Sequence, residues 1–196
     1  MAVGQPTAGR KASRDVQPIL SEISRRRKLS LFLRHLRPGD SVLEVGAGAG
    51  WFARQLRDRG WRVTTLDVTP PADIVGDINQ WESLGIRPSS FDAVVALELI
   101  EHVDCLHALA AVCKPGGLIM LSSPHPDFDW LMVILERLHL TQKRTSPHVH
   151  LTDLAAIPLP RVVLRRPLLI HQVAIFRNAG PRRVSKQNDQ FQRRSF

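Results

Sequence analysis

Apolar positions along the chain predict an alternation of short strands and helices. Five segments are predicted to be strands, at residues 41–45, 62–66, 74–75, 91–97 and 118–122. Apolar residues at helical spacing predict helices over 51–59 and 103–113. The continuous apolar runs VVAL, within 91–97, and LIML, within 118–122, are typical of parallel strands covered on both faces. The pattern predicts a doubly wound α/β fold, since right-handed crossovers leave few other topologies.

Further elements are expected at both ends of this pattern. Apolar residues recur at helical spacing over 18–36 around a basic run, Arg25–Lys28, which predicts one or two helices before the sheet. Residues 129–140 predict an apolar helix after the fifth strand, either as a cover over a substrate or as part of the core. Two more strands are expected around 161–164 and 169–176, with prolines at their edges.

The net charge of +9 is concentrated at the ends of the chain. Residues 1–37 carry +7 and residues 178–196 carry +4, whereas residues 38–177 carry −2. Segments 1–17 and 178–196 also lack apolar periodicity, so we expect two disordered basic tails around a single domain at 18–177. Solvated tails explain the charge most simply, and recruitment of RNA or of a membrane surface by the basic run is the alternative.

The apolar stretches and the cysteines of the sequence bear on its localisation and on the redox state of its thiols. No stretch approaches the ~18 apolar residues that cross a bilayer, and the first residues lack the apolar core of a secretory signal. We therefore expect a cytoplasmic protein. Cys105 and Cys113 lie eight positions apart in one predicted helix, so their Cα atoms would be about 12 Å apart, too far for a disulfide. They are expected to be buried, reduced thiols.

A glycine-rich turn follows the first predicted strand. Residues 42–50 read VLEVGAGAG, a buried strand that runs into three spaced glycines and then a helix. Glycines are needed where a backbone turns sharply and approaches a ligand without a Cβ. Asp67 stands 21 residues after Gly46, at the end of the second predicted strand. An acid there accepts hydrogen bonds from ribose hydroxyls in Rossmann-type sites, and a turn cap is the alternative.

Three ordered motifs carry a resemblance to a known family. The loop spaces its glycines G-x-G-x-G with Glu44 two residues ahead, whereas the NAD fingerprint has G-x-G-x-x-G. Residues 91–103 (FDAVVALELIEHV) and 114–118 (KPGGL) complete the set. Over about residues 28–176 the chain resembles class I S-adenosylmethionine-dependent methyltransferases, and it is most similar to the small-molecule group of the ubiquinone and menaquinone pathways. The resemblance implies a mostly parallel seven-stranded sheet, S-adenosylmethionine as cofactor, and methyl transfer to a small-molecule oxygen, nitrogen or carbon acceptor.

The resemblance also assigns cofactor contacts by position. Glu44 would lie beneath the sulfonium end, Asp67 would hold the ribose, and Asp77 would meet the adenine amino group. Only nine residues separate Asp67 from Asp77, and Pro70-Pro71 disfavours a helix there. We therefore expect the helix between strands two and three to be shortened or absent, with a more open adenine pocket. The full set of expected cofactor contacts is Glu44, Gly46, Ala47, Gly48, Gly50, Asp67, Val68, Asp77, Ile78, Leu97 and Glu98.

Two histidines are candidate bases for the chemical step. His102 follows the fourth strand and His125 follows the fifth, at the carboxyl edge where α/β sites open. Either imidazole can take a proton near neutral pH, and local packing or capping is the alternative role. His148 and His150, with Asp127 nearby, have a spacing that can bind metal, but loop polarity explains it more simply and we expect no metal site.

Two other classes of function compete with a small-molecule enzyme. One is an RNA or protein methyltransferase recruited through the basic N-terminal segment, which would bind nucleic acid in a salt-sensitive way. The other is a non-catalytic protein that binds S-adenosylmethionine. Intact Gly46, Gly48, Gly50 and Asp67 favour a working cofactor site.

Overall fold

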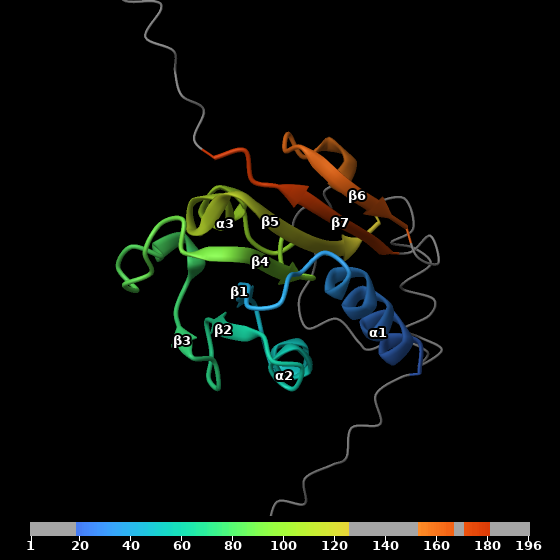
Figure 1. Cartoon of the computed structure of the whole chain (residues 1–196), viewed down its shortest axis with the longest axis horizontal. Coiled ribbons are helices and arrows are strands. Elements are labelled where there is room, and N and C mark those ends of the chain that lie inside the picture. Colours follow the sequence, from blue (N-terminus) through green and yellow to red (C-terminus); the bar gives the residue numbers. More distant parts are fainter. Residues whose placement is uncertain (1–18, 126–152, 167–170, 181–196) are drawn as a thin grey trace, which may run out of the picture.

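A seven-stranded open sheet forms the centre of the molecule (Figure 1). The computed structural model describes residues 19–125, 153–166 and 171–180. The strand order is β3-β2-β1-β4-β5-β7-β6; β1 to β5 are parallel, and β7 is antiparallel to both β5 and β6. The strands are β1 (Ser41–Val45), β2 (Arg62–Asp67), β3 (Ile74–Val75), β4 (Phe91–Leu97), β5 (Cys113–Pro124), β6 (Arg161–Arg165) and β7 (His171–Arg177). The predicted doubly wound, mostly parallel sheet is confirmed.

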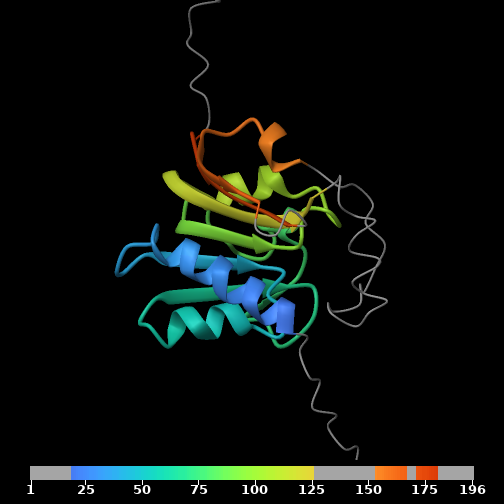
Figure 2. The ribbon, with the colours of Figure 1, turned by 90° about the vertical axis from the view of Figure 1, so that its right-hand side faces the viewer.

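Helices cover both faces of the sheet. The described helices are α1 (Ile19–Leu33), α2 (Trp51–Arg57) and α3 (Leu106–Val112), with short 3-10 turns η1 (Ile78–Gln80) and η3 (Leu154–Ala156). The helices α1 and α2 pack together on one face, as Figure 2 shows, and α3 packs on the other. In the part of the chain that the structure describes, no helix is long and apolar enough to cross a membrane.

The consecutive apolar residues of the central strands divide between two cores. Val42 of β1 packs with α1 and α2, whereas the next residue, Leu43, packs with α3. Strand β4 alternates in the same way, with Val95 on the first side and Val94 on the second, and all four side chains are fully buried. Side chains of a strand point to opposite faces in turn, so an unbroken apolar run is what a sheet covered on both faces requires.

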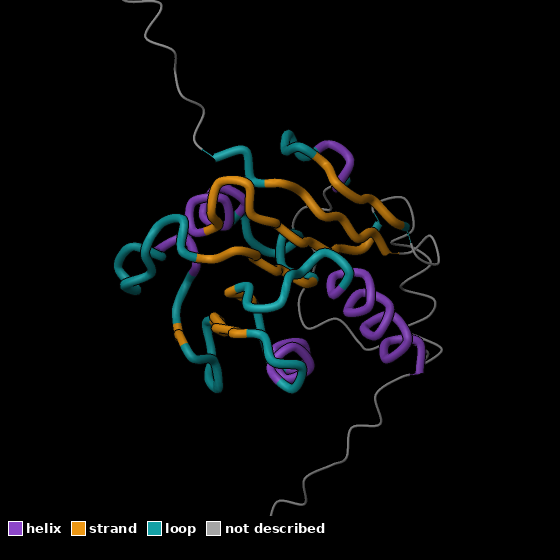
Figure 3. The backbone as a smooth tube through the Cα atoms, viewed as in Figure 1, coloured by secondary structure: helices purple, strands orange, loops and turns teal. Residues whose placement is uncertain are grey.

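The helix between β2 and β3 is absent, as the sequence predicts. A loop joins the two strands (Figure 3). Asp73 holds this loop against the sheet, because its Oδ2 accepts hydrogen bonds from the backbone N and the Oγ1 of Thr65, at 2.8 and 2.7 Å. In this loop Val68, which directly follows β2, is 69% exposed.

The segment 114–117 differs from the predicted turn. Strand β5 begins already at Cys113, and the segment forms an irregularity inside the strand, where the pairing with β4 shifts. The end of β7 stabilises it, since Gly116 N donates to Asn178 O and Asn178 N donates to Gly117 O. Buried Asn178 therefore belongs to the fold, although the sequence analysis places it in the C-terminal tail.

The cysteines also lie in a different place from the one predicted. Helix α3 is shorter than expected, so Cys105 precedes it and Cys113 begins β5, rather than both lying in one helix. Both thiols are buried and free. Burial raises the pKa of each to about 12, so neither is a reactive thiolate at neutral pH.

Replacing Gly117 with alanine should destabilise the fold by about 3 kcal/mol, because the site has no room for a methyl group. A Cβ there would lie 2.8 Å from Asp92 O and 2.9 Å from both Cys113 Sγ and Lys114 O. Gly116→Ala is the control, since its Cβ would meet nothing within 4 Å and only its φ of +80° is unfavourable, at about 1 kcal/mol. Urea denaturation measures both, and equal losses would contradict the steric explanation.

Candidate functional site

The glycine loop leaves open space at the carboxyl end of β1. Gly46, Gly48 and Gly50 have φ of +72°, +51° and +67°, the left-handed region that favours glycine. A Cβ at Gly46 would lie 3.1 Å from Leu99 Cδ1, whereas a Cβ at Gly48 would meet nothing within 4 Å. A side chain at the first glycine would therefore crowd Leu99, whereas the second glycine leaves the backbone open to a ligand.

Asp67 ties the end of β2 to the glycine loop. Its Oδ2 accepts a hydrogen bond from Gly48 N at 2.8 Å. Its Oδ1 accepts from Thr69 N and from Thr69 Oγ1, each at 3.0 Å. The carboxylate therefore caps a turn and meets the loop at the same time, whereas its contact with ribose hydroxyls stays a prediction. Each carboxylate oxygen has two lone pairs, so Oδ1 is filled by its two donors and Oδ2 can accept one further hydrogen bond.

Glu44 lies under the loop rather than at its open side. It is 4% exposed, and its Oε2 accepts a hydrogen bond from Ala53 N at 2.9 Å. Ala53 is in the first turn of α2, whose amides have no partner within the helix. Burial raises the pKa of Glu44 to about 7, although the hydrogen bond from Ala53 N lowers it. The side chain thus joins β1 to α2, and a contact with the cofactor stays a prediction.

The fold should lose stability between about pH 4.5 and pH 7 through Glu44. The pKa is raised on folding, so the native state holds the proton more tightly and its advantage disappears as pH rises through about 7. Glu44→Gln keeps an acceptor for Ala53 N and removes the buried charge. At pH 8 this variant should be more stable than the wild type by up to about 3 kcal/mol. Urea denaturation across this pH range measures it.

Glu82→Gln is the matched control for that change, because Glu82 is exposed. The same loss of one negative charge should change the free energy of unfolding there by no more than about 0.5 kcal/mol. An equal effect of the two substitutions would contradict the buried-charge explanation.

Asp77 and Ile78 lie after β3, near the end of β2. Asp77 caps η1, since its Oδ1 accepts a hydrogen bond from Asn79 N at 2.9 Å. Ile78 is buried, and Asn79 Nδ2 donates to Asp104 O. The pairing of Asp67 with Val75 places this turn beside the end of β2. The adenine contact stays a prediction for Asp77, whose side chain has this structural role.

The end of β4 carries a partly buried ionic cluster around Glu98, whose side chain is 34% exposed. The residue follows Leu97 with a φ of +51°. Its Oε1 accepts hydrogen bonds from Lys28 Nζ and from Ser122 Oγ, the latter at 2.7 Å. Its Oε2 lies 3.5 Å from His171 Nδ1. Burial alone would raise the pKa of Glu98, but Lys28 and His171 outweigh it and hold the pKa well below 4.5.

Sequence reasoning missed two members of this cluster. Lys28 belongs to the basic run, yet it is 6% exposed and reaches a carboxylate 70 positions away. A helical signal existed, because Lys28 lies four residues before Phe32, which is fully buried. His171 is the first residue of β7, and antiparallel pairing with β5 brings it beside Pro124.

The basic run is therefore not one exposed surface. Lys28 is buried, whereas Arg26 is exposed and pairs with Glu22 at 2.9 Å.

The two predicted bases differ in their surroundings. His102 is exposed, and its backbone N donates to Leu99 O in a turn after β4. His125 is 4% exposed and follows the end of β5. Glu101, which directly precedes His102, is 2% exposed, and its pKa is raised to about 7 by burial and then by the charge of Glu98. Residues 129–140, Asp127, His148 and His150 lie outside the described residues.

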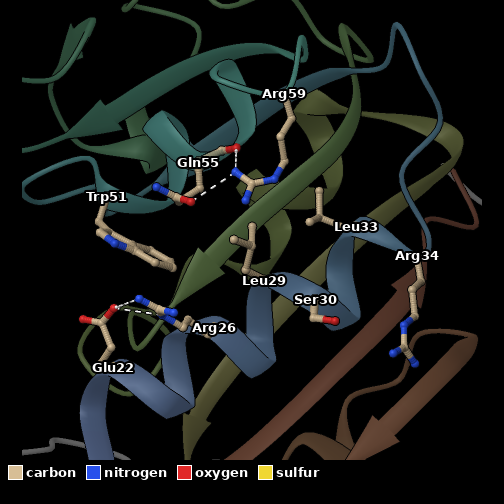
Figure 4. A pocket seen from close by; sticks show the side chains of 9 residues that line it. All are labelled: Glu22, Arg26, Leu29, Ser30, Leu33, Arg34, Trp51, Gln55 and Arg59. Atoms are coloured by element: carbon tan, nitrogen blue, oxygen red, sulfur yellow. Dashed lines mark hydrogen bonds and ion pairs between the residues drawn. The ribbon is translucent and has the colours of Figure 1, made fainter. Parts of the chain in front are cut away.

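A cavity of about 570 Å³ lies elsewhere, between α1 and α2 (Figure 4). Two of its arginines are held by neighbours, Arg26 by Glu22 and Arg59 by Gln55. The lining residues are Glu22, Arg26, Leu29, Ser30, Leu33, Arg34, Trp51, Gln55 and Arg59. None of the expected cofactor contacts lines this cavity, although Trp51 directly follows the glycine loop.

Comparison with known families identifies the family of this chain. A family model described as "Methyltransferase domain" matches residues 14–157, which is more than half of the chain. The chain belongs to this family. The match includes the glycine loop, Asp67 and the Glu98 cluster except His171.

Two curated relatives of this methyltransferase-domain protein are both named ubiquinone biosynthesis O-methyltransferase. The chain is 33% identical over 104 residues to the one of Xanthomonas campestris, covering 44% of each chain. It is 30% identical over 150 residues to the enzyme of that name in Idiomarina loihiensis, covering 61% of this chain and 62% of the relative. The matches thus span less than two thirds of the relatives' length.

Solved structures share the fold at low sequence identity. A putative sarcosine dimethylglycine methyltransferase from Galdieria sulphuraria aligns with a TM-score of 0.58 and 18% identity, covering 82% of this chain and 88% of that one. A SAM-dependent methyltransferase from Methanosarcina mazei aligns with a TM-score of 0.57 and 17% identity, covering 77% and 98%. The sheet described above is therefore the one found in these methyltransferases.

Proposed function

We propose that this methyltransferase-domain protein binds S-adenosylmethionine at the glycine loop and transfers its methyl group to a small-molecule acceptor. The observation that carries the proposal is the hydrogen bond from Gly48 N to Asp67 Oδ2. It brings the acid of β2 to the loop after β1, at the carboxyl edge where open α/β sheets bind their ligands. Belonging to the methyltransferase-domain family supports the same conclusion.

The residues present fit this cofactor. The space beside Gly48 admits a ligand against the backbone, and the Asp67 carboxylate beside it can accept from a ribose hydroxyl. Exposed Val68 offers an apolar surface for a flat ring next to that acid. Asp77 and Ile78 would then face the adenine edge. When bound, S-adenosylmethionine supplies a methyl group already activated on a sulfonium.

We propose that the acceptor is the oxygen of a hydroxyl group on an aromatic ring. The relatives named ubiquinone biosynthesis O-methyltransferases support oxygen over nitrogen or carbon. Methyl transfer from a sulfonium is an in-line displacement, so the protein has to align the acceptor, exclude water and accept a proton from the hydroxyl. Leu97 and Glu98 would place that reaction at the end of β4. We further propose a cytoplasmic location for it.

The burial of Lys28 speaks against recruitment of RNA through the basic run. A patch that binds phosphates needs accessible cations, and here one of the four residues is bound to Glu98 inside the protein. The positive φ at Gly48 and the intact Asp67 contact likewise speak against a scaffold that has lost its cofactor site.

Calorimetry followed by a transfer assay tests the proposal. S-adenosylmethionine and S-adenosylhomocysteine should bind with one site per chain, and NAD should not. Tritiated S-adenosylmethionine should then label catechol, protocatechuate or nitrocatechol. Binding of NAD alone would overturn the cofactor assignment, and binding of S-adenosylmethionine without labelling of these phenols would overturn the oxygen acceptor.

A further inference from the structure

We propose that His171 is the base that takes the hydroxyl proton of the acceptor, with Glu98 holding its ring. This inference rests on the proposed function and adds the residue that performs the proton transfer. The observation behind it is the approach of His171 Nδ1 to Glu98 Oε2, at 3.5 Å. The two residues come from different strands and meet at the carboxyl edge of the sheet.

Antiparallel pairing places His171 at that edge. Strand β7 begins at His171, which pairs with Pro124, the last residue of β5. Because β4 and β5 are parallel, the end of β4 and Glu98 lie at the same edge. The side chain of His171 is 17% exposed. It is thus largely shielded from bulk water, as a base in a site that excludes water should be.

A carboxylate beside Nδ1 favours the histidine tautomer that can act as a base. It favours the tautomer with the proton on Nδ1, which leaves Nε2 as the proton acceptor. It also stabilises the imidazolium that forms when Nε2 takes a proton. Glu98 is suited to this role because Lys28 and Ser122 bind its other oxygen, Oε1, and leave Oε2 facing the histidine.

The charges around the pair are consistent with a proton moving onto His171. Glu98 stays ionised, because Lys28 from α1 and His171 hold its pKa well below 4.5. Glu101 lies close enough to Glu98 for the two charges to repel, and its own pKa is raised to about 7. The described ionisable groups that interact with Glu98 are thus Lys28, Glu101 and His171, with buried His125 following the neighbouring Pro124.

The proposed step balances. The O–H bond of the acceptor breaks and its proton goes to His171 Nε2. The oxygen uses its electron pair to form a bond to the methyl carbon. The bond between that carbon and sulfur breaks with its electrons on sulfur, which leaves S-adenosylhomocysteine. His171 then gives the proton to water.

Replacing His171 with glutamine tests this role. With catechol as acceptor, kcat should fall by about 100- to 10,000-fold, the usual contribution of a general base. The dissociation constant of S-adenosylmethionine should change by less than about threefold, since the side chain does not touch the donor in this proposal. The rise of kcat with pH in the wild type should be absent from the variant.

Nitrocatechol separates a base from a merely structural residue. Its more acidic hydroxyl is ionised at neutral pH, so its methylation needs no base and His171→Gln should lose less than about tenfold with it. His107→Gln, an exposed histidine on α3, is the matched control and should leave both rates unchanged. Melting curves establish that each variant is folded.

The outcomes distinguish this inference from the proposed function. If the wild type labels none of the phenols, the oxygen-transfer function fails and the base fails with it. If the wild type is active and His171→Gln keeps its rate with catechol, the inference alone is overturned. Equal losses with catechol and nitrocatechol would show a structural role instead. If His102→Gln or His125→Gln, rather than His171→Gln, lost its rate with catechol and kept it with nitrocatechol, that histidine would be the base and the inference would be overturned.

Discussion

Replacing Asp67 with asparagine should weaken S-adenosylmethionine binding by at least about 100-fold. The wild-type carboxylate accepts from Gly48 N on one oxygen and from Thr69 N and Oγ1 on the other, and it would accept a ribose hydroxyl as well. An amide has a single acceptor oxygen, so its NH₂ group would face donors on one side. Loss of the charge-assisted hydrogen bond to the ribose, with an NH₂ group turned toward a donor, costs about 3 kcal/mol, which is a factor above 100. Calorimetry measures it.

Thr69→Val is the matched control for this experiment. Valine removes the hydroxyl that donates to Asp67 Oδ1 and keeps the backbone N–H that donates to the same oxygen. Binding should fall by no more than about tenfold, since the hydroxyl contacts Asp67 and not the cofactor, and the backbone N–H of Thr69 still holds the same oxygen. If Asp67→Asn bound the cofactor within about threefold of the wild type, the ribose assignment would be wrong, and with it the proposal for the loop.

Much of the fold was predictable because local patterns determine it. The runs around Val42 and Val94 are apolar at consecutive positions, as a strand covered on both faces requires. The glycine loop and Asp67 were predictable for a related reason. Their separation of 21 residues is that of a loop, a helix and the second parallel strand, so their meeting at one edge follows from topology.

The contacts around Glu98 were not predictable in this way. The contact between Lys28 and Glu98 joins residues 70 positions apart, through a helix that precedes the sheet and has no fixed place in the alternating pattern. His171 reaches the carboxyl edge only because β7 runs antiparallel to β5, and an apolar run does not reveal strand direction. The bulge at 114–117 depends on Asn178, which comes more than sixty residues later.

The ion pair between Lys28 and Glu98 makes one residue of the basic run important for the stability of the fold. Lys28→Met should lower the free energy of unfolding by about 2–3 kcal/mol at pH 7. Breaking a buried ion pair from one side costs about 3–5 kcal/mol, because the remaining charge is left without its partner. Here the Glu98 side chain is 34% exposed, so water screens part of the loss. Urea denaturation measures the difference.

Arg27→Met is the matched control, because Arg27 is the exposed neighbour of Lys28 on the same helix. It removes the same charge, yet it should change the free energy of unfolding by no more than about 0.5 kcal/mol. If the two variants were equally destabilised, net charge rather than the ion pair would explain the loss. The double variant Lys28→Met/Glu98→Gln should recover part of the stability, since it no longer buries an unpaired carboxylate.

The pH dependence of this difference identifies the carboxylate responsible. The pKa of Glu98 is lowered on folding, so the stability that the pair contributes is present above pH 4.5 and is lost as pH falls through the lower folded pKa. The gap between the wild type and Lys28→Met should therefore narrow on acidification, whereas the effect of Glu44 develops between about pH 4.5 and 7. A gap that stayed constant down to pH 3 would mean that Lys28 stabilises the fold through the packing of its aliphatic stem. A gap that narrows would mean that α1 is held to the end of β4 by the same carboxylate that faces His171.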